Sequence, residues 1–224
     1  MLLRHYSLNE DEQKLVNMSV GEFDSYMMEN YADMFRNRNV KEGQEVIYPM
    51  NFGFSIGPGW RHVLDSLCRK LKFIQELTGL ICVFDQIKEK YGSARFYYHV
   101  EASEDGAQDN KDLADIVDDL VHLYEEYTDY VCEELGTNID PDEKVQMGSW
   151  MYGMGIEGFE KCERKHNSEY SDKRIEMAKR GLESAKKRKE IKKSMYYFDM
   201  SELEELEKVV NEISKKRKAK NELV

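Results

Sequence analysis

Apolar residues recur at intervals of three and four along three segments, a spacing that places their side chains on one face of an α-helix. The clearest segment covers residues 60–77, and Gly79 follows it as a helix stop. An earlier one starts at Ser19, with Glu22 as the other end of a capping box. We therefore expect three amphipathic helices, whose apolar positions are Phe23, Met27, Tyr31, Met34 and Phe35; Trp60, Val63, Leu64, Leu67, Leu71, Ile74 and Leu77; and Leu113, Ile116, Val117, Leu120, Tyr124, Tyr127 and Val131.

Two segments between the second and third helices have the pattern of β-strands. Residues 80–87 are a short run rich in branched apolar side chains, and residues 94–100 alternate with period two. The charged turn around Gly92 separates them, which predicts a hairpin. The expected fold is α+β: a small antiparallel sheet near residues 80–100, packed by amphipathic helices. The glycine- and proline-rich residues 37–59 and the aperiodic residues 136–158 predict irregular segments.

The last quarter of the chain has a different pattern, which predicts an α+β body over residues 1–167 and a charged helical arm over residues 168–224. Ser201 and Glu204 form a second capping box, which opens a helix with an unpartnered apolar stripe. A helical hairpin within the arm and a coiled coil with another copy of the chain both satisfy this pattern. The predicted docking or oligomerisation stripe consists of Leu203, Leu206, Val209, Val210 and Ile213.

Charge divides the chain in the same way. Residues 173–224 hold 16 Lys and Arg against 10 Asp and Glu, a net charge of +6, while residues 1–172 hold 17 against 34, a net charge of −17. Nucleic acid should be repelled by the body and attracted by the arm, where phosphate contacts would weaken steeply with salt. The candidate contacts to nucleic acid or to an acidic partner are Lys186, Lys187, Arg188, Lys189, Lys192 and Lys193.

Composition limits the class of protein. Among the 224 residues 41% are hydrophobic and 3 are proline, which is typical of a folded chain rather than a disordered one. The first residues lack the apolar run of a signal peptide, and no segment is apolar enough to span a membrane. Four cysteines indicate a reducing compartment and no disulfide framework. We therefore expect a cytoplasmic protein without a membrane partner.

Three quoted segments carry a family resemblance: YADMFRNRN, FGFSIGPGWRHVLDSLCRKL and QIKEKYGSARFYY. Their order and spacing over roughly residues 31–166 resemble a widespread family of small phage and prophage proteins whose function is not established. The resemblance implies a location in the cytoplasm of the host cell. It brings no activity with it, and the basic arm lies outside it.

Members of that family often carry a small zinc site made by a Cys-x-x-Cys and a later Cys/His pair. The resemblance matches Cys132 to the first ligand, but Leu135 stands at the second position. Cys162 and His166 are the candidates for the later pair. A structural zinc site needs four ligands, so a water, Glu133 or Glu134 would have to complete this one. The alternative is that no metal binds and Cys132 packs as a small apolar residue.

No catalytic motif is legible. Asp85, Gln86 and Lys88, with Asp65 upstream, give a loose version of a Mg²⁺-dependent nuclease cluster. Charged residues beside a hairpin turn more commonly form a solvated edge. The Gly run before Trp60 lacks the pattern of a phosphate-binding loop, and His62, Asp65 and Ser66 are too close in sequence to form a nucleophilic triad. His62 is expected at the surface or in the first helical turn.

Together these patterns favour a non-enzymatic phage-type accessory protein that binds another macromolecule and interferes with a host process such as a defence system. The expected partner is a host or phage protein, or a second copy of the chain. The alternatives are a nucleic-acid-associated protein that uses the basic arm, and a metal-dependent enzyme of unknown reaction.

Overall fold

The computed structural model describes residues 7–38, 49–102, 111–166 and 170–190. The chain forms two compact units, Met1–Lys179 and Arg180–Val224. The predicted boundary after residue 167 lies outside the described residues. Because the first unit extends to Lys179, the first turns of the helix of residues 171–190 belong with the body. Among the described residues, no helix has the length and apolar content required to cross a membrane.

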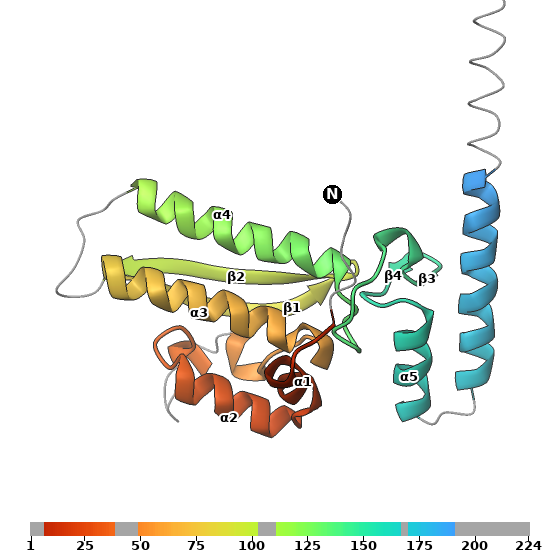
Figure 1. Ribbon diagram of the computed structural model, residues 1–224, viewed down its shortest axis with the longest axis horizontal. Helices are drawn as coiled ribbons and strands as arrows, with labels where there is room; N and C mark the ends of the chain where they lie inside the picture. The colour runs from red at the N-terminus through yellow and green to blue at the C-terminus, as the bar shows by residue number, and fades with distance from the viewer. Residues whose placement is uncertain (1–6, 39–48, 103–110, 167–169, 191–224) are drawn as a thin grey trace, which may run out of the picture. The chain divides into compact units, whose positions relative to one another are not determined.

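A two-stranded antiparallel hairpin forms the main sheet, as predicted. Its strands are β1, Leu80–Lys90, and β2, Ser93–Ala102 (Figure 1). Tyr91 and Gly92 join them with φ values of 54° and 79°, the left-handed conformation that a two-residue hairpin turn requires. A β-bulge lies between Phe84 and Gln86, so Asp85 has no partner of its own on β2.

Two long helices pack on this hairpin and on each other: α3, Arg61–Thr78, along β1, and α4, Lys111–Tyr127, along β2 (Figure 1). Helix α3 ends at Gly79 in the left-handed conformation, φ 73°, which confirms the predicted helix stop. The α+β fold class is thus confirmed. A second small sheet pairs β3, Gln146–Met147, with β4, Trp150–Met151.

Two short helices, α1, Glu10–Asn17, and α2, Val20–Asn30, enlarge the core (Figure 1). The predicted capping box of Ser19 and Glu22 is present; the periodicity did not reveal α1. Aromatic rings connect this region to the hairpin, because Phe35 stacks on Phe84 at 5.2 Å between ring centroids. The largest fully buried side chains of this core are Trp60, Phe23, Phe35, Phe84, Met27, Met34, Met50, Leu64, Leu67, Leu71 and Ile87.

The glycines before Trp60 dock against the segment that follows α4. The backbone N–H of Gly59 donates to the carbonyl of Glu133 at 2.6 Å, and the Trp60 indole donates to the carbonyl of Val131 at 2.7 Å. Short 3₁₀ turns flank these contacts at Pro58–Trp60 and Thr128–Tyr130. Residues 57–60 and residues 131–136, which both lack regular periodicity, therefore stabilise one another.

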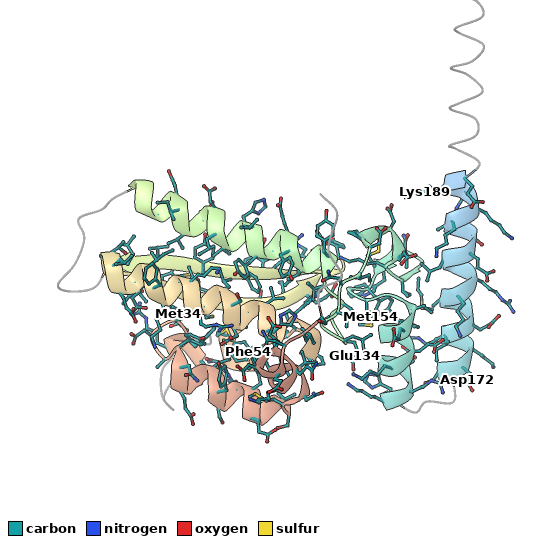
Figure 2. The ribbon with its side chains drawn as sticks, viewed as in Figure 1. Met34, Phe54, Glu134, Met154, Asp172 and Lys189 are labelled. Carbon is teal, nitrogen blue, oxygen red and sulfur yellow. The ribbon has the colours of Figure 1, made fainter. Side chains whose placement is uncertain are left out.

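Helix α5, Ile156–His166, follows the second small sheet. Glu134, which is buried, forms ion pairs with Lys165 and, at 3.5 Å, with Lys161 of this helix (Figure 2). The helix of residues 171–190 contacts α5 in turn, since Arg174 lies 3.1 Å from a carboxylate oxygen of Glu163. Ion pairs thus hold an otherwise irregular region, in which the short turn Pro141–Glu143 also lies.

Three details of the predicted helices were wrong. The first of them ends at Asn30 rather than at residue 35. Helix α4 ends at Tyr127 because Thr128 turns the chain: its hydroxyl donates to the carbonyl of Glu125 and accepts from the N–H of Ala94. The third concerns the predicted buried faces, since Leu77 is 68% exposed and Ile116 is 51% exposed.

Candidate protein-docking groove

An open apolar groove of about 590 Å³ lies between α3 and α4. Two of its lining residues, Phe73 and Ile116, are large apolar side chains with exposed fractions of 60% and 51%. Single exposed apolar residues are normal on a protein surface, but two that line one groove make it a candidate interaction site. The residues that define this α3–α4 groove are Ser66, Arg69, Lys70, Phe73, Ile74, Ile116 and Leu120.

The apolar character continues along both helices beyond the groove. Leu77 follows Phe73 by one helical turn on α3, and Leu123 follows Leu120 on α4 with an exposed fraction of 59%. Each helix therefore carries two apolar faces, one buried against the hairpin and one open to solvent. The helical periodicity recognised residues of both faces but did not separate them.

Basic side chains edge the groove within a body that is strongly acidic overall. Arg69 lies 2.9 Å from Asp65, one turn earlier on α3, and Lys70 follows it. Ser66 and Tyr124 share a hydrogen bond of 2.9 Å between their hydroxyl oxygens, which fixes α3 against α4 near the end of the groove. The groove therefore combines an apolar lining with a basic rim.

The carboxylate of Asp65 is engaged in hydrogen bonds that hold the fold together. Its carboxylate accepts hydrogen bonds from the hydroxyls of Tyr26 at 2.9 Å and Tyr31 at 2.7 Å. Burial, and then the hydrogen bond to Asp65, raise the pKa of Tyr31 well above its usual value. Asp85 has different partners, Asn37 and His99. The two carboxylates of the hypothetical nuclease cluster thus share no partner.

His62 was predicted at the surface or in the first turn of its helix; it lies in the first turn but is only 4% exposed. Burial lowers its pKa, so the neutral imidazole is favoured. The Asp65 carboxylate accepts hydrogen bonds from tyrosine hydroxyls and is not placed to orient His62 toward Ser66. The hydroxyl of Ser66 is hydrogen-bonded to Tyr124 instead.

The candidate zinc ligands are not brought together. In the part of the chain that the structure describes, no three His, Cys, Asp or Glu side chains form a group able to hold a metal ion, although Cys132, Cys162 and His166 are all described. Burial raises the pKa of the Cys132 thiol, and backbone N–H groups of Leu135, Glu134 and Gly155 point at its sulfur. A side chain at Gly158 would come within 2.6 Å of that sulfur. The residues present do not fit a zinc site.

The remaining predicted site residues belong to the arm. Lys186, Lys187, Arg188 and Lys189 are exposed on the helix of residues 171–190. Lys192 and Lys193 lie outside the described residues. The stripe of Leu203, Leu206, Val209, Val210 and Ile213 also lies outside them.

Glu133 is a titratable group that the sequence singled out only as a possible fourth ligand to zinc. Its carboxylate accepts a hydrogen bond from the backbone N–H of Gly57 at 2.9 Å. Burial, as the largest effect, raises the pKa of Glu133 to about 7. Between about pH 4.5 and pH 7, Glu133 is protonated in the folded protein and ionised in the unfolded chain. The free energy of unfolding therefore falls as the pH rises through this range.

Replacing Glu133 by glutamine should therefore stabilise the protein at pH 8 and leave it nearly unchanged at pH 4. A shift of this size corresponds to a gain on the order of 3 kcal/mol in the free energy of unfolding at pH 8. Urea unfolding of Glu133→Gln and of the natural chain at pH 4, 6 and 8 measures this difference in stability. A difference between the variant and the natural chain that is the same at all three pH values would contradict the assignment.

No protein-family model matches the chain, and neither the curated proteins nor the solved structures contain a significant match to it. The resemblance to phage proteins therefore stays a prediction. What the protein does must be argued from the geometry of its own surface.

Proposed function

We propose that the protein acts by binding another protein, and that its α3–α4 groove receives an amphipathic helix of that partner. The observation that carries this proposal is the exposure of Phe73 and Ile116 in one groove. An amphipathic helix can bury its apolar face in a groove of this kind, anchored at positions three and four residues apart. Arg69 and Lys70 favour a partner helix with acidic residues beside its apolar face.

The resemblance supports a narrower form of this proposal. A phage-type accessory protein would find its partner among host proteins, and interference with a host process such as a defence system is the corresponding role. This form rests on the quoted sequence segments and not on the groove. The proposal of a host partner and the proposal of binding in the α3–α4 groove can therefore fail separately.

The nucleic-acid alternative rests on a different observation, the run of basic residues from Lys186 to Lys189 on an exposed helical surface. The net charge of −17 over residues 1–172 opposes close approach of a polyanion to the body. The groove offers nothing to phosphates beyond its basic rim. We therefore place protein binding first.

Exchanging both Phe73 and Ile116 for serine should abolish partner binding while the fold remains. Aromatic and aliphatic anchors contribute most at interfaces, so recovery of the partner should fall at least about tenfold. Both side chains are more than half exposed, so thermal stability should change little. The measurement is affinity purification of the full-length chain from the expressing cells, with mass spectrometry and light scattering of the recovered complex.

Two control variants locate the effect. Val20 is 76% exposed on α2, outside the groove, so Val20→Ser removes an apolar side chain that is even more exposed than Phe73 and Ile116. Reversing the charges of Lys186, Lys187, Arg188 and Lys189 to glutamate tests the arm. The groove proposal requires both controls to recover the partner as the natural chain does. Recovery of the same proteins with the groove variant, or loss only on charge reversal, would contradict it.

A further inference from the structure

The outer edge of β2 is covered over only part of its length. In an antiparallel ladder, the backbone groups of alternate residues point toward the neighbouring strand and away from it. The N–H of Ala94 donates to the Thr128 hydroxyl at 2.9 Å, and the N–H of Phe96 donates to the Glu125 carboxylate at 2.6 Å. These two residues therefore direct their backbone groups away from β1, and side chains of α4 and the following turn satisfy them.

Farther along β2, the same edge is open. The bulge lies on β1, so the alternation along β2 is unbroken, and Tyr98 and Val100 face the outer edge as Ala94 and Phe96 do. The partner of Tyr98 is Phe84, whose N–H donates away from β2 to Met34, as expected for a pair that exchanges no hydrogen bonds. Within the described residues, nothing accepts from the outward N–H of Tyr98 or Val100.

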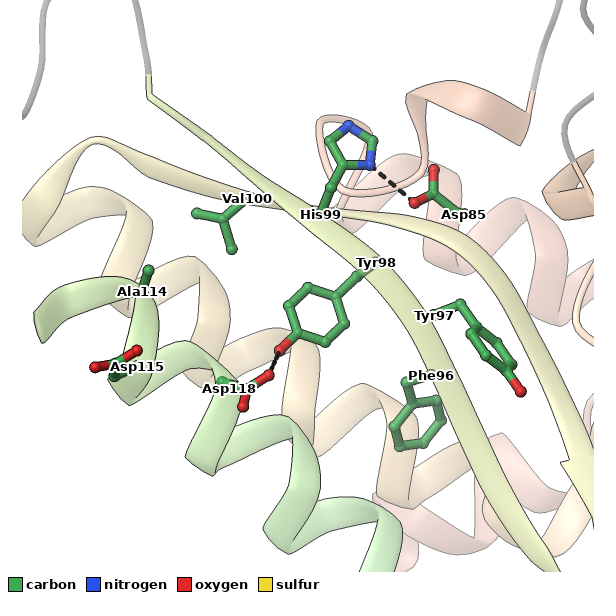
Figure 3. A pocket seen from close by; sticks show the side chains of 9 residues that line it. All are labelled: Asp85, Phe96, Tyr97, Tyr98, His99, Val100, Ala114, Asp115 and Asp118. Carbon is green, nitrogen blue, oxygen red and sulfur yellow. Dashed lines mark hydrogen bonds and ion pairs between the residues drawn. The ribbon is translucent and has the colours of Figure 1, made fainter. Parts of the chain in front are cut away.

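A hollow of about 640 Å³ lies at this open edge (Figure 3). Tyr97 and His99 line it from one face of β2, and Tyr98 and Val100 line it from the other. Successive side chains of a strand point to opposite faces, so a hollow that both sets reach lies beside the strand. The space is therefore where a further strand would pair.

Carboxylates border the hollow on both sides. Asp115 and Asp118 come from α4, and Asp118 accepts a hydrogen bond of 2.5 Å from the hydroxyl of Tyr98 (Figure 3). Asp85, at the bulge, lies 2.9 Å from a ring nitrogen of His99. The described lining includes these three carboxylates and no Lys or Arg. The local charge is thus negative, beside an aromatic surface.

We infer that the outer edge of β2 binds an extended basic peptide segment as a third strand of the sheet. The segment's backbone pairs with Tyr98 and Val100, and its Lys or Arg side chains lie beside Asp115 and Asp85. A second copy of this chain is a poor occupant, because symmetric pairing of two β2 edges brings these carboxylates close to their own copies. The surface is distinct from the α3–α4 groove and does not depend on it.

A seven-residue peptide of alternating lysine and valine is the probe, titrated into the full-length chain by isothermal calorimetry. A second peptide with the same sequence carries N-methyl groups on alternate residues, along the edge that pairs. If β2 pairs with the peptide backbone, N-methylation should weaken binding at least about tenfold, because backbone hydrogen bonds are lost while charge is kept. Equal affinity of the two peptides overturns the inference.

A pair of variants on α4 tests the charge. Asp115→Lys reverses a carboxylate that lines the hollow, whereas Asp119→Lys reverses an exposed carboxylate of the same helix that does not line it. We expect about tenfold weaker binding for the first and less than about twofold change for the second at physiological salt. Equal weakening by both would mean general charge attraction and would overturn the inference.

Amide hydrogen exchange identifies the occupant directly. In the free protein, the N–H groups of Tyr98 and Val100 should exchange fast, and the unmethylated peptide should slow both. Slow exchange without peptide at every protein concentration would show that the chain covers its own edge. Slowing that grows with protein concentration would show a second copy there. Either result overturns the inference.

Discussion

Alanine at position 59 should unfold the body or destabilise it severely. A Cβ atom at Gly59 would meet the carbonyl oxygen of Cys132 at 2.2 Å and the backbone nitrogen of Gly136 at 2.4 Å. Backbone atoms cannot rotate away as a side chain can, so the segment after α4 must move and lose the hydrogen bond from Gly59 to Glu133. We expect a loss of about 3 kcal/mol or more in the free energy of unfolding.

Gly21→Ala is the matched control for this substitution. Gly21 lies in the first turn of α2 with no atom within 4 Å of an added Cβ, so alanine there should be neutral or slightly stabilising. Urea unfolding of both variants, followed by circular dichroism, measures the difference. An unchanged unfolding midpoint for Gly59→Ala would show that the docking of residues 57–60 on residues 131–136 is not as described.

Local signals account for the parts of the fold that the sequence predicted. A capping box at Ser19, a left-handed glycine at the end of α3 and a two-residue turn at Gly92 each act within a few residues. Their physical effect does not depend on distant parts of the chain. The α+β class, the hairpin and the long helices could therefore be predicted from spacing and turn chemistry alone.

Contacts between distant segments account for most of what was missed. The pattern before Trp60 indicated only a loop, because the backbone that Gly59 approaches lies more than seventy residues later. Helical spacing likewise grouped Leu77 and Ile116 with core residues of their helices, although both side chains are more than half exposed. The periodicity included three residues that line the α3–α4 groove, Ile74, Ile116 and Leu120, but not Phe73, and it did not show that they border an open groove.

The candidate metal site shows the limit of reasoning from a resemblance. Cys132 was matched by its place in the sequence, and that place is a backbone turn whose N–H groups point at the sulfur. Cys162 and His166 are one turn apart on α5, and the structure does not gather them with Cys132. The positions of Cys132, Cys162 and His166 in the sequence matched those of the family's zinc ligands. A match in position did not establish that the three side chains meet in space.

Removing the Asp65 carboxylate should cost about 3 kcal/mol or more, because Asp65→Ala leaves the hydroxyls of Tyr26 and Tyr31 without their acceptor in a buried site. A nuclease role predicts the opposite pattern: stability kept and a Mg²⁺-dependent activity lost. Urea unfolding in a double-mutant cycle with Tyr31→Phe separates the two, since the cost should shrink once the Tyr31 hydroxyl is absent. Asp119→Ala, which removes an exposed carboxylate, is the control and should change stability by less than about 0.5 kcal/mol. Additive costs of Asp65→Ala and Tyr31→Phe would contradict the structural role.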